Sequence, residues 1–366
     1  QGRLEVVYAD VPSLSLIEPL PLTSDGELIV GTDVSMSVTT ADVQSGAILT
    51  LEADSVWDAD QVHIDGGTLD TNIDLDYPTG GDFLLTGSGT INILNNTTLT
   101  LPYFDPTNIS SGTVNLPAGS TLSITADAAT VGDTVTLIKD GSFGLSDQIS
   151  DLTIESGGTV THSARLEAGL VLDVTGTLDI QAGGSIDVSG MGLRGGNNGS
   201  AFGDSGEAYD AGGAIVSAGN YSFSAGAGAS YGGRGGTASS GVPSNEPYGA
   251  LEQAQYLGSG GGGGGYGREG GHGGGRVTVT ATTFLLNGTL QANGWRGYYG
   301  YPEGGGGSGG GVSIAAGALS GTGSLEAIGA NGFWSKSGSG GGGRIAVSYD
   351  TWSPQELSIS ARGGGS

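Results

Sequence analysis

A short phrase that recurs through the first half of the chain places the strongest constraint on its fold. The phrase is a glycine, usually followed by threonine, and then apolar residues that alternate with polar ones. Successive copies start 18 to 26 residues apart, at Gly46, Gly67, Gly89, Gly112, Gly132, Gly158 and Gly176. Period-two alternation predicts that each copy is a β-strand with one buried face.

The near-constant spacing predicts how these strands are arranged. About 20 residues is the length of one coil of a β-solenoid, in which each coil buries its apolar face only against its neighbours. The glycine of each copy is expected at a corner that needs a positive φ. A β-sandwich, with a strand about every 8–12 residues, also fits, because many coils hold two or three short strands. The recurrence of the phrase itself favours an all-β, elongated parallel β-solenoid (β-helix).

Glycine supplies 76 of the 366 residues, and its unbroken runs lie in the second half. Strand-like segments open directly after glycine triplets at Arg276, Val312 and Arg344, so the coils continue between the runs. Collagen is excluded because glycine does not fall on every third residue. The runs are either disordered spacers or extended segments that pack backbone to backbone in a polyglycine-II-like layer. Their repetition at matching points of successive coils favours the packed layer.

These patterns divide the chain into four segments. Residues 1–26 are expected to hold an N-terminal strand that continues or pairs with a neighbouring unit, and residues 27–190 to form the solenoid ladder. Residues 191–275 form one long glycine-rich excursion. Residues 276–366 are expected to return to solenoid coils with shorter excursions.

Composition narrows the class of protein. The chain has no cysteine, and 11 basic residues face 37 acidic ones, for a net charge of −26. Such a charge repels nucleic acid and anionic lipid. No run of about 20 apolar residues occurs, so no membrane span is expected. Enrichment in threonine, serine, aspartate and glycine is typical of an exported bacterial surface protein. Without a signal-peptide pattern, Gln1 is either a mature N-terminus or a cut within a longer chain.

The two ends of the chain share the pattern Gly-Arg-apolar-x-Val-x-Tyr, with the arginines 341 positions apart. A strand that recurs at both ends suggests one unit of a head-to-tail array of copies. The alternative is that any stacked β-coil resembles any other. The residues expected at the contact between units are Arg3, Leu4, Val6, Tyr8, Arg344, Ile345, Val347 and Tyr349.

The second half resembles the glycine-rich β-solenoid repeats of very large bacterial extracellular and adhesin-like proteins. The resemblance covers roughly residues 155–366. It rests on Tyr-Gly-Gly-Arg-Gly-Gly at residues 231–236, Gly-Thr-Leu-Gln-Ala-Asn-Gly at 288–294 and Gly-Gly-Gly-Gly-Arg-Ile-Ala-Val-x-Tyr at 340–349. It implies secretion, a β-helical fold and a surface or matrix role, and it brings no catalytic motif.

Acidic residues in the first half raise the question of metal binding or catalysis. Asp58, Asp60 and Asp65 lie close together in the sequence and are weak candidates for a Ca²⁺ site. A polysaccharide lyase would also need a basic residue beside such carboxylates, yet no lysine or arginine occurs between Leu4 and Ile138. Solvent-facing or corner positions explain the aspartates equally well. We therefore expect no enzyme activity and no cofactor, with Ca²⁺ left possible.

Aromatic residues gather in the glycine-rich excursions. They could form a surface for a glycan or a partner protein, or they could cap the layer and pack between chains. The candidates are Trp295, Tyr298, Tyr299, Tyr301, Phe333 and Trp334.

These observations predict an extracellular structural repeat unit that stacks head to tail into a bacterial surface filament or matrix fibre. Its expected partners are copies of itself, with a cell-surface or matrix polysaccharide as a further possibility. A glycan-binding adhesin that uses the aromatic excursions is the alternative. A polysaccharide-degrading β-helix enzyme is disfavoured by the missing base.

Overall fold

The computed structural model describes residues 3–6, 13–16, 20–23, 25–77, 82–144, 149–196, 204–219, 221–222, 225–298, 300, 303–332, 336–353 and 356–365. These residues form 29 β-strands and no helix. Among them, accordingly, no helix is long and apolar enough to cross a membrane. The chain divides into two compact units, residues 1–161 with 173–185 and residues 162–172 with 186–366.

Strands of the first unit stack in parallel, each one coil after the last. One sheet takes a strand from every coil, in the order β1 (Arg3–Val6), β4 (Glu27–Val30), β6 (Ile48–Leu51), β8 (Thr68–Thr71), β11 (Gly89–Ile93), β13 (Gly112–Leu116), β16 (Val135–Lys139) and β19 (Thr159–Thr161). Each neighbouring pair in this series is parallel. Parallel neighbours that are also successive coils define a β-solenoid, which confirms the predicted fold class.

The other strands of the first unit form the remaining faces of its coils. A second sheet holds β2 (Ser13–Leu16), β3 (Leu20–Leu22), β5 (Ser35–Gln44), β7 (Val56–Asp65) and β10 (Phe83–Thr86). A third holds β9 (Leu75–Asp76), β12 (Thr98–Leu101) and β14 (Thr121–Ile124). A further group holds β15 (Ala128–Val131), β17 (Gly141–Gly144), β18 (Asp151–Ile154) and the end of β20 (Leu170–Ile180). The short strand β21 (Ser185–Asp187) crosses the unit boundary.

The recurring phrase sets the register from coil to coil. Its apolar residues pair directly and are fully buried, in the order Leu49, Leu69, Ile91, Val114, Leu137 and Val160. Burying each such side chain contributes about 1.5–3 kcal/mol. Shifting one coil by a single residue would turn this row toward solvent, so the apolar row specifies the register.

Polar residues of the same phrase form matching rows on the outer face. Threonines pair along the row Thr68, Thr90, Thr113, Thr136 and Thr159. All but Thr136, which follows Val135, come directly after the lead glycine of their copy. Two positions further, Asn115 Nδ2 donates to Asn92 Oδ1 at 3.3 Å and Asn92 Nδ2 donates to Asp70 Oδ1 at 2.6 Å. The outer face therefore supports the same register as the core.

Glycines at the coil corners differ in part from the sequence expectation. At the corner before β8, the positive φ of 76° belongs to Gly66, one residue before the lead glycine of the phrase. Gly67 is needed for close approach, because a Cβ there would lie 2.6 Å from the carbonyl oxygen of Val43 on the preceding coil.

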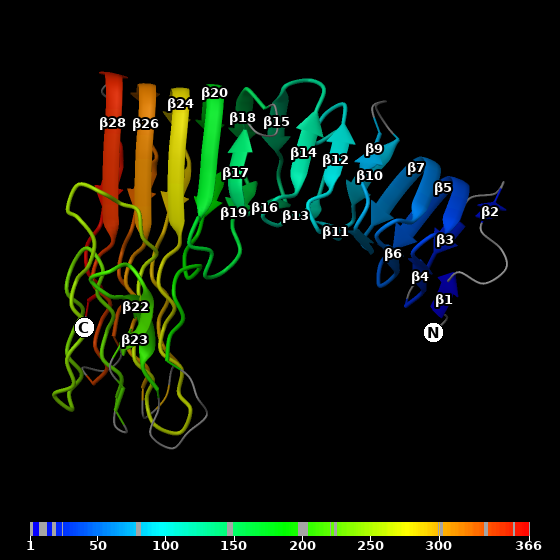
Figure 1. Ribbon diagram of the computed structural model, residues 1–366. Coiled ribbons are helices and arrows are strands. Elements are labelled where there is room, and N and C mark those ends of the chain that lie inside the picture. Colours follow the sequence, from blue (N-terminus) through cyan, green and yellow to red (C-terminus); the bar gives the residue numbers. More distant parts are fainter. Residues whose placement is uncertain are drawn as a thin grey trace. The chain divides into compact units, whose positions relative to one another are not determined.

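The second unit keeps the stacked strands and adds long glycine-rich segments. Figure 1 shows β24 (Arg276–Leu286), β26 (Gly311–Ser320) and β28 (Arg344–Trp352) side by side, with extended segments that leave the ends of the strands. A second parallel group holds β25 (Thr289–Gln291), β27 (Ser324–Glu326) and β29 (Ser358–Ser360). The strands β22 (Gly206–Tyr209) and β23 (Ile215–Gly219) form an antiparallel hairpin.

The extended segments form the glycine layer, which we define as residues 257–264, 268–275, 304–310 and 338–343 together with the segments they bond. Successive N–H groups in 305–310 donate in turn to three different neighbours, at 2.7–3.0 Å. Gly305 and Ser308 donate to Gly262 and Ser259, Gly306 and Gly309 to Gly338 and Gly341, and Gly307 and Gly310 to Trp295 and Ala292. A period of three residues is that of the polyproline-II helix. The predicted polyglycine-II-like layer is thus confirmed.

Packing in the glycine layer leaves no space for a Cβ atom at Gly305 or at Gly307. A Cβ at Gly305 would lie 1.9 Å from the carbonyl oxygen of Ala227, and a Cβ at Gly307 would lie 1.9 Å from that of His272. Both distances are far below van der Waals contact, and the obstructing atoms are backbone. Glycine is therefore required here by close approach, and the runs are structural elements rather than spacers.

Candidate functional site

The coil formed by β28 and β29 exposes apolar side chains among the residues that the structure describes. Along the stack of β24, β26 and β28, Ala281 pairs with Ala316 and Ala316 pairs with Tyr349. Ala316 is only 7% exposed, whereas Tyr349 is 46% exposed. In the neighbouring sheet, Leu325 is fully buried while its partner Ile359 in β29 is 48% exposed. Positions that face the core in earlier coils therefore face solvent in the last one.

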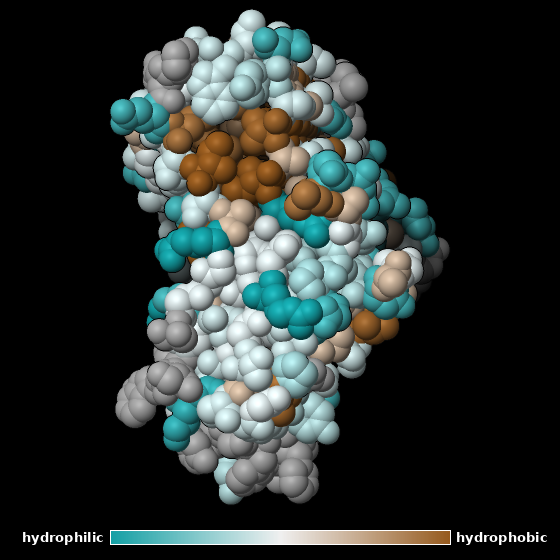
Figure 2. Space-filling model, turned by 90° about the vertical axis from the view of Figure 1, so that its left-hand side faces the viewer, coloured by the Kyte–Doolittle hydropathy of each residue, from teal (hydrophilic) through white to brown (hydrophobic). Residues whose placement is uncertain are grey.

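We call this surface the end face and define it by Ile345, Val347, Tyr349, Trp352 and Ile359. Ile345 and Val347 pair with the buried Val312 and Ile314 but are themselves only half-buried. The rings of Tyr349 and Trp352 meet edge to face, with centroids 5.0 Å apart. Figure 2 shows a contiguous hydrophobic patch in the upper part of the side that carries β28. A contiguous exposed apolar patch is a common mark of a protein interface.

Three of the predicted contact residues, Ile345, Val347 and Tyr349, lie on this end face. Arg344 does not extend from it, because its guanidinium carbon lies 5.1 Å from the ring centroid of Tyr231 and its Nη1 donates to the carbonyl oxygen of Ala250. At the other end, the backbone of Arg3, Leu4 and Val6 forms β1, while their side chains and Tyr8 lie outside the described residues.

The shared end pattern does not mark equivalent places in a coil. β1 pairs with β4, in the sheet formed by the Gly-Thr phrases. β28 instead pairs with β26, while Leu290 and Leu325, which follow the Gly-Thr and Gly-Ser pairs, lie in β25 and β27. Resemblance between the two ends is therefore a resemblance between strands that occupy different sheets.

The aromatic candidates in the glycine-rich excursions have structural partners. Trp295 is 52% exposed, and its ring packs against Gly190, where a Cβ would lie 2.3 Å from it. Tyr298 is 49% exposed, and the Arg268 guanidinium lies 4.3 Å from its ring centroid. These contacts favour the structural-packing alternative for both rings. The remaining candidates, Tyr299, Tyr301, Phe333 and Trp334, lie outside the described residues.

The acidic candidates for Ca²⁺ do not converge. Asp58, Asp60 and Asp65 are exposed residues of β7, and the Thr86 hydroxyl donates to Asp65 Oδ1 at 3.0 Å. Within the part of the chain that the structure describes, no three His, Cys, Asp or Glu side chains form a group that could hold a metal ion. Solvent-facing positions on a strand account for these three aspartates.

A tyrosine cluster in the second unit was not anticipated as a site from the sequence. Tyr209, at the end of β22, lies with its ring centroid 5.4 Å from that of Tyr248 and 4.8 Å from that of Tyr256. Tyr231 stacks on Tyr248 at 4.9 Å and 25°. The signal available in the sequence was the presence of six tyrosines, four of them in this cluster, in the glycine-rich excursion of residues 191–275.

Burial perturbs the phenols of this cluster. Loss of solvent raises the pKa of Tyr248 well above its usual value, and burial is also the main cause that raises the pKa of Tyr231 and of Tyr209. The nearby Glu167 carboxylate, which accepts a hydrogen bond from the Tyr209 hydroxyl at 3.4 Å, raises the pKa of Tyr209 further. These three phenols are therefore neutral at physiological pH.

An ion pair fixes the strand that carries Tyr209. Arg165 Nε donates to Glu207 Oε2 at 2.8 Å, and the backbone N–H of Arg194 donates to the same oxygen at 3.1 Å. Burial acts to raise the pKa of Glu207, but these hydrogen bonds outweigh it and the pKa is lowered. On the backbone, the N–H of Gly260 donates to the Glu207 carbonyl, which joins β22 to the glycine layer.

Comparisons with known proteins add little to this geometry. No family model matches the chain, and no curated protein matches it. Among solved structures, a crystal structure of a TibC-catalysed, hyper-glycosylated fragment of TibA is 13% identical, over 98% of this chain and 97% of that chain, with a TM-score of 0.19. A likeness this slight carries no argument, so fold and function rest on the contacts described above.

Proposed function

We propose that this chain is a structural repeat unit of an extracellular surface filament or matrix fibre, in which copies stack head to tail. The end face of the last coil carries the proposal. Its apolar side chains continue, in register, positions that are buried in the preceding coil. A further coil placed on β28 and β29 would bury them in the same way.

Edge strands at both ends support stacking in one direction. Within the described sheets, β28 and β29 are terminal strands in the second unit, and β1 and β2 are terminal strands in the first. A terminal strand presents unpaired N–H and C=O groups that can pair with another chain. Contact between two different ends does not close on itself, so repeated contacts of this kind generate a filament.

Charge sets a condition on this assembly. A net charge of −26 makes copies repel one another at low ionic strength. Salt screens that repulsion over about 10 Å at 0.1 M, while contact between apolar faces does not weaken. Association through the end face should therefore strengthen as salt is added, whereas association through ion pairs would weaken. The proposal gives the chain no catalytic role.

Analytical ultracentrifugation of the full chain over a range of concentrations and salt tests the proposal. We expect the unmodified chain to form open-ended oligomers that grow with concentration, and electron microscopy to show linear particles. Tyr349→Lys places a charge in the centre of the end face and should abolish association, while the melting temperature stays close to that of the unmodified chain.

Leu251→Lys is the matched control, because Leu251 is 81% exposed and lies outside the end face. This variant should associate as the unmodified chain does. A chain that stays monomeric at every concentration and salt level would contradict the proposal. Equal loss of association in both variants would show that added positive charge, rather than the end face, controls assembly.

A further inference from the structure

The second unit contains a cavity beside the tyrosine cluster, and none of its lining residues belongs to the end face. Its volume is about 670 Å³, within the range of about 300–1,000 Å³ typical of small-molecule sites. Its lining includes Tyr209, Tyr248 and Tyr256 together with Asp210, Glu246 and Pro247. Three aromatic rings and two carboxylates thus meet around one space that could hold one or two sugar rings.

Aromatic side chains along this cavity are held rigidly. The Tyr248 hydroxyl donates to the Leu257 carbonyl oxygen at 2.6 Å, and the Tyr231 ring stacks on Tyr248. The backbone N–H of Tyr256 donates to the Tyr231 hydroxyl at 3.3 Å. Tyr209 and Tyr248 are buried while Tyr256 is half-buried, so Tyr256 presents the more accessible ring. A ring fixed in this way loses little conformational freedom when a ligand packs on it.

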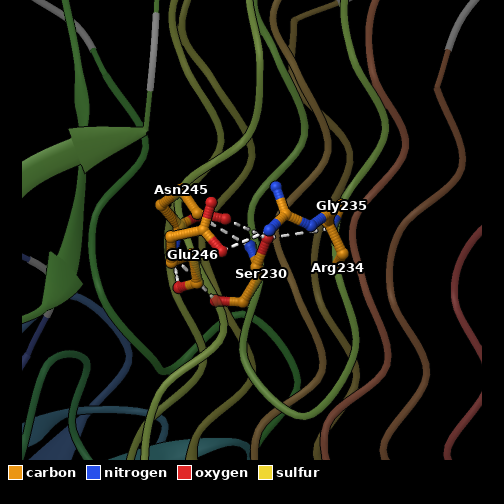
Figure 3. Close-up of polar contacts among 5 residues, drawn as sticks. All are labelled: Ser230, Arg234, Gly235, Asn245 and Glu246. Carbon is orange, nitrogen blue, oxygen red and sulfur yellow. Dashed lines mark hydrogen bonds and ion pairs between the residues drawn. The ribbon is translucent and has the colours of Figure 1, made fainter.

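Hydrogen bonds also fix the loop that carries Glu246 and Pro247. Figure 3 shows Asn245 and Ser230 facing each other, with Arg234 reaching toward Glu246. Asn245 Oδ1 accepts from the Ser230 N–H at 2.8 Å, and the Ser230 hydroxyl donates to the Asn245 carbonyl at 2.6 Å. Arg234 Nη2 forms an ion pair with Glu246 Oε2. The cavity is therefore preformed rather than dependent on a ligand for its shape.

Charges around the cavity indicate a neutral ligand. Asp210 Oδ1 accepts from the N–H groups of Gly212 and Ala214 at 2.8 and 2.9 Å, which holds an exposed carboxylate at the cavity. That carboxylate and the net charge of −26 oppose an anion. Two guanidinium groups lie beside the cavity and offset its two carboxylates locally, because Arg234 pairs with Glu246 and Arg344 donates to the carbonyl oxygen of Ala250, another lining residue. The cavity therefore offers no net charge to a cation.

We propose that this cavity binds a neutral saccharide unit. The apolar C–H face of the sugar packs on the Tyr256 ring, and its hydroxyl groups donate to the carboxylates of Asp210 and Glu246. Tyrosine suits this use because its ring is flat and apolar while its hydroxyl remains polar. The lining shares no residue with the end face, so the proposal does not depend on the proposed stacking. It would attach a structural unit to a polysaccharide of neutral sugars.

Saturation-transfer NMR on the full chain tests this site, with glucose, galactose, mannose and N-acetylglucosamine as probes and choline as a cationic comparison. We expect saturable transfer to the ring protons of at least one neutral sugar and none to choline. Tyr256→Ala should weaken binding of that sugar about tenfold, the loss of one aromatic contact. Glu246→Gln, at a largely exposed side chain, should weaken it less and leave the melting temperature unchanged.

Tyr298→Ala is the matched control, because Tyr298 is an exposed tyrosine of the same unit that does not line the cavity. Binding by this variant should equal that of the unmodified chain. The proposal is overturned if no neutral sugar binds saturably, or if Tyr298→Ala abolishes binding while Tyr256→Ala and Glu246→Gln preserve it. Choline that binds with the same dependence on Tyr256 would overturn the assignment to a neutral ligand.

Discussion

Both units of this protein stack successive coils, but they use side chains in opposite ways. In the first unit, a row of fully buried aliphatic residues such as Leu69, Ile91 and Leu137 holds successive coils together. In the glycine layer of the second unit, backbone meets backbone, and a single Cβ at Gly307 would collide with the carbonyl of His272. The first unit is stabilised by the burial of aliphatic side chains. The glycine layer is stabilised by close backbone contact, which the missing Cβ atoms of its glycines allow.

This difference shows how each unit can be damaged. A coil filled by leucine loses stability when atoms are removed, because a cavity remains. The glycine layer loses stability when atoms are added at its glycines, because its N–H groups bond three neighbours in turn and those neighbours cannot move apart independently. A substitution that enlarges a glycine should therefore destabilise the second unit, and one that shortens a buried leucine should destabilise the first.

The largest effect is expected from adding a side chain to the glycine layer. Gly307→Val should destabilise the second unit by more than about 4 kcal/mol, an exceptional value for one substitution, because its Cβ would displace backbone. Gly363→Ala is the control, since the nearest atom to its Cβ would be the Gly340 carbonyl oxygen at 3.4 Å. Denaturant unfolding measures both, and equal stability of the two variants would contradict the packed layer.

A smaller loss is expected from removing a side chain in the first unit. Leu137→Ala should cost about 3 kcal/mol, because the cavity forms between the paired residues Val114 and Val160. Thr136→Ala, on the half-exposed outer face, should change stability by less than about 0.5 kcal/mol. Denaturant unfolding followed by circular dichroism gives both values. A negligible cost for Leu137→Ala would mean that the aliphatic row does not hold the coils together.

The smallest effect is expected at the tyrosine cluster, where the second unit buries large side chains as the first unit does. Burial raises the pKa of Tyr248, Tyr231 and Tyr209 in the folded state. A group with a raised folded pKa stabilises the fold below its unfolded pKa of about 10 and loses that contribution as pH rises further. We therefore expect the second unit to become less stable above pH about 10.

Measuring the free energy of unfolding at increasing pH, together with tyrosinate absorbance, tests this dependence. Tyr248→Phe removes one titrating group and should flatten the curve above pH about 10, at the cost of about 1 kcal/mol for the lost hydrogen bond to Leu257. Tyr77 in the first unit, whose pKa burial raises to about 12, should contribute a similar slope to that unit. A flat profile for the second unit would contradict the burial of its phenols.

Sequence periodicity was sufficient for the architecture because coil length and apolar alternation are local properties. The spacing of the Gly-Thr phrases predicted the solenoid, and the same phrases pair with one another from coil to coil. The packed glycine layer was also predicted, because the runs recur at matching points of successive coils. At the corner before β8, the sequence predicted the positive φ at Gly67, whereas the structure has it at Gly66. A corner and a close approach both require glycine, so the two cannot be told apart in the sequence.

The sequence by itself therefore determined the coil, the register and the requirement for glycine, all of which follow from short-range pattern. Only the tertiary structure decided which surfaces remain available. It buried Ala316 and exposed its partner Tyr349, and it paired Arg344 with Tyr231. It also brought Tyr209 to within 5.4 Å of Tyr248, between ring centroids, across almost forty intervening residues. Exposure and convergence depend on how distant segments pack, which no local pattern encodes.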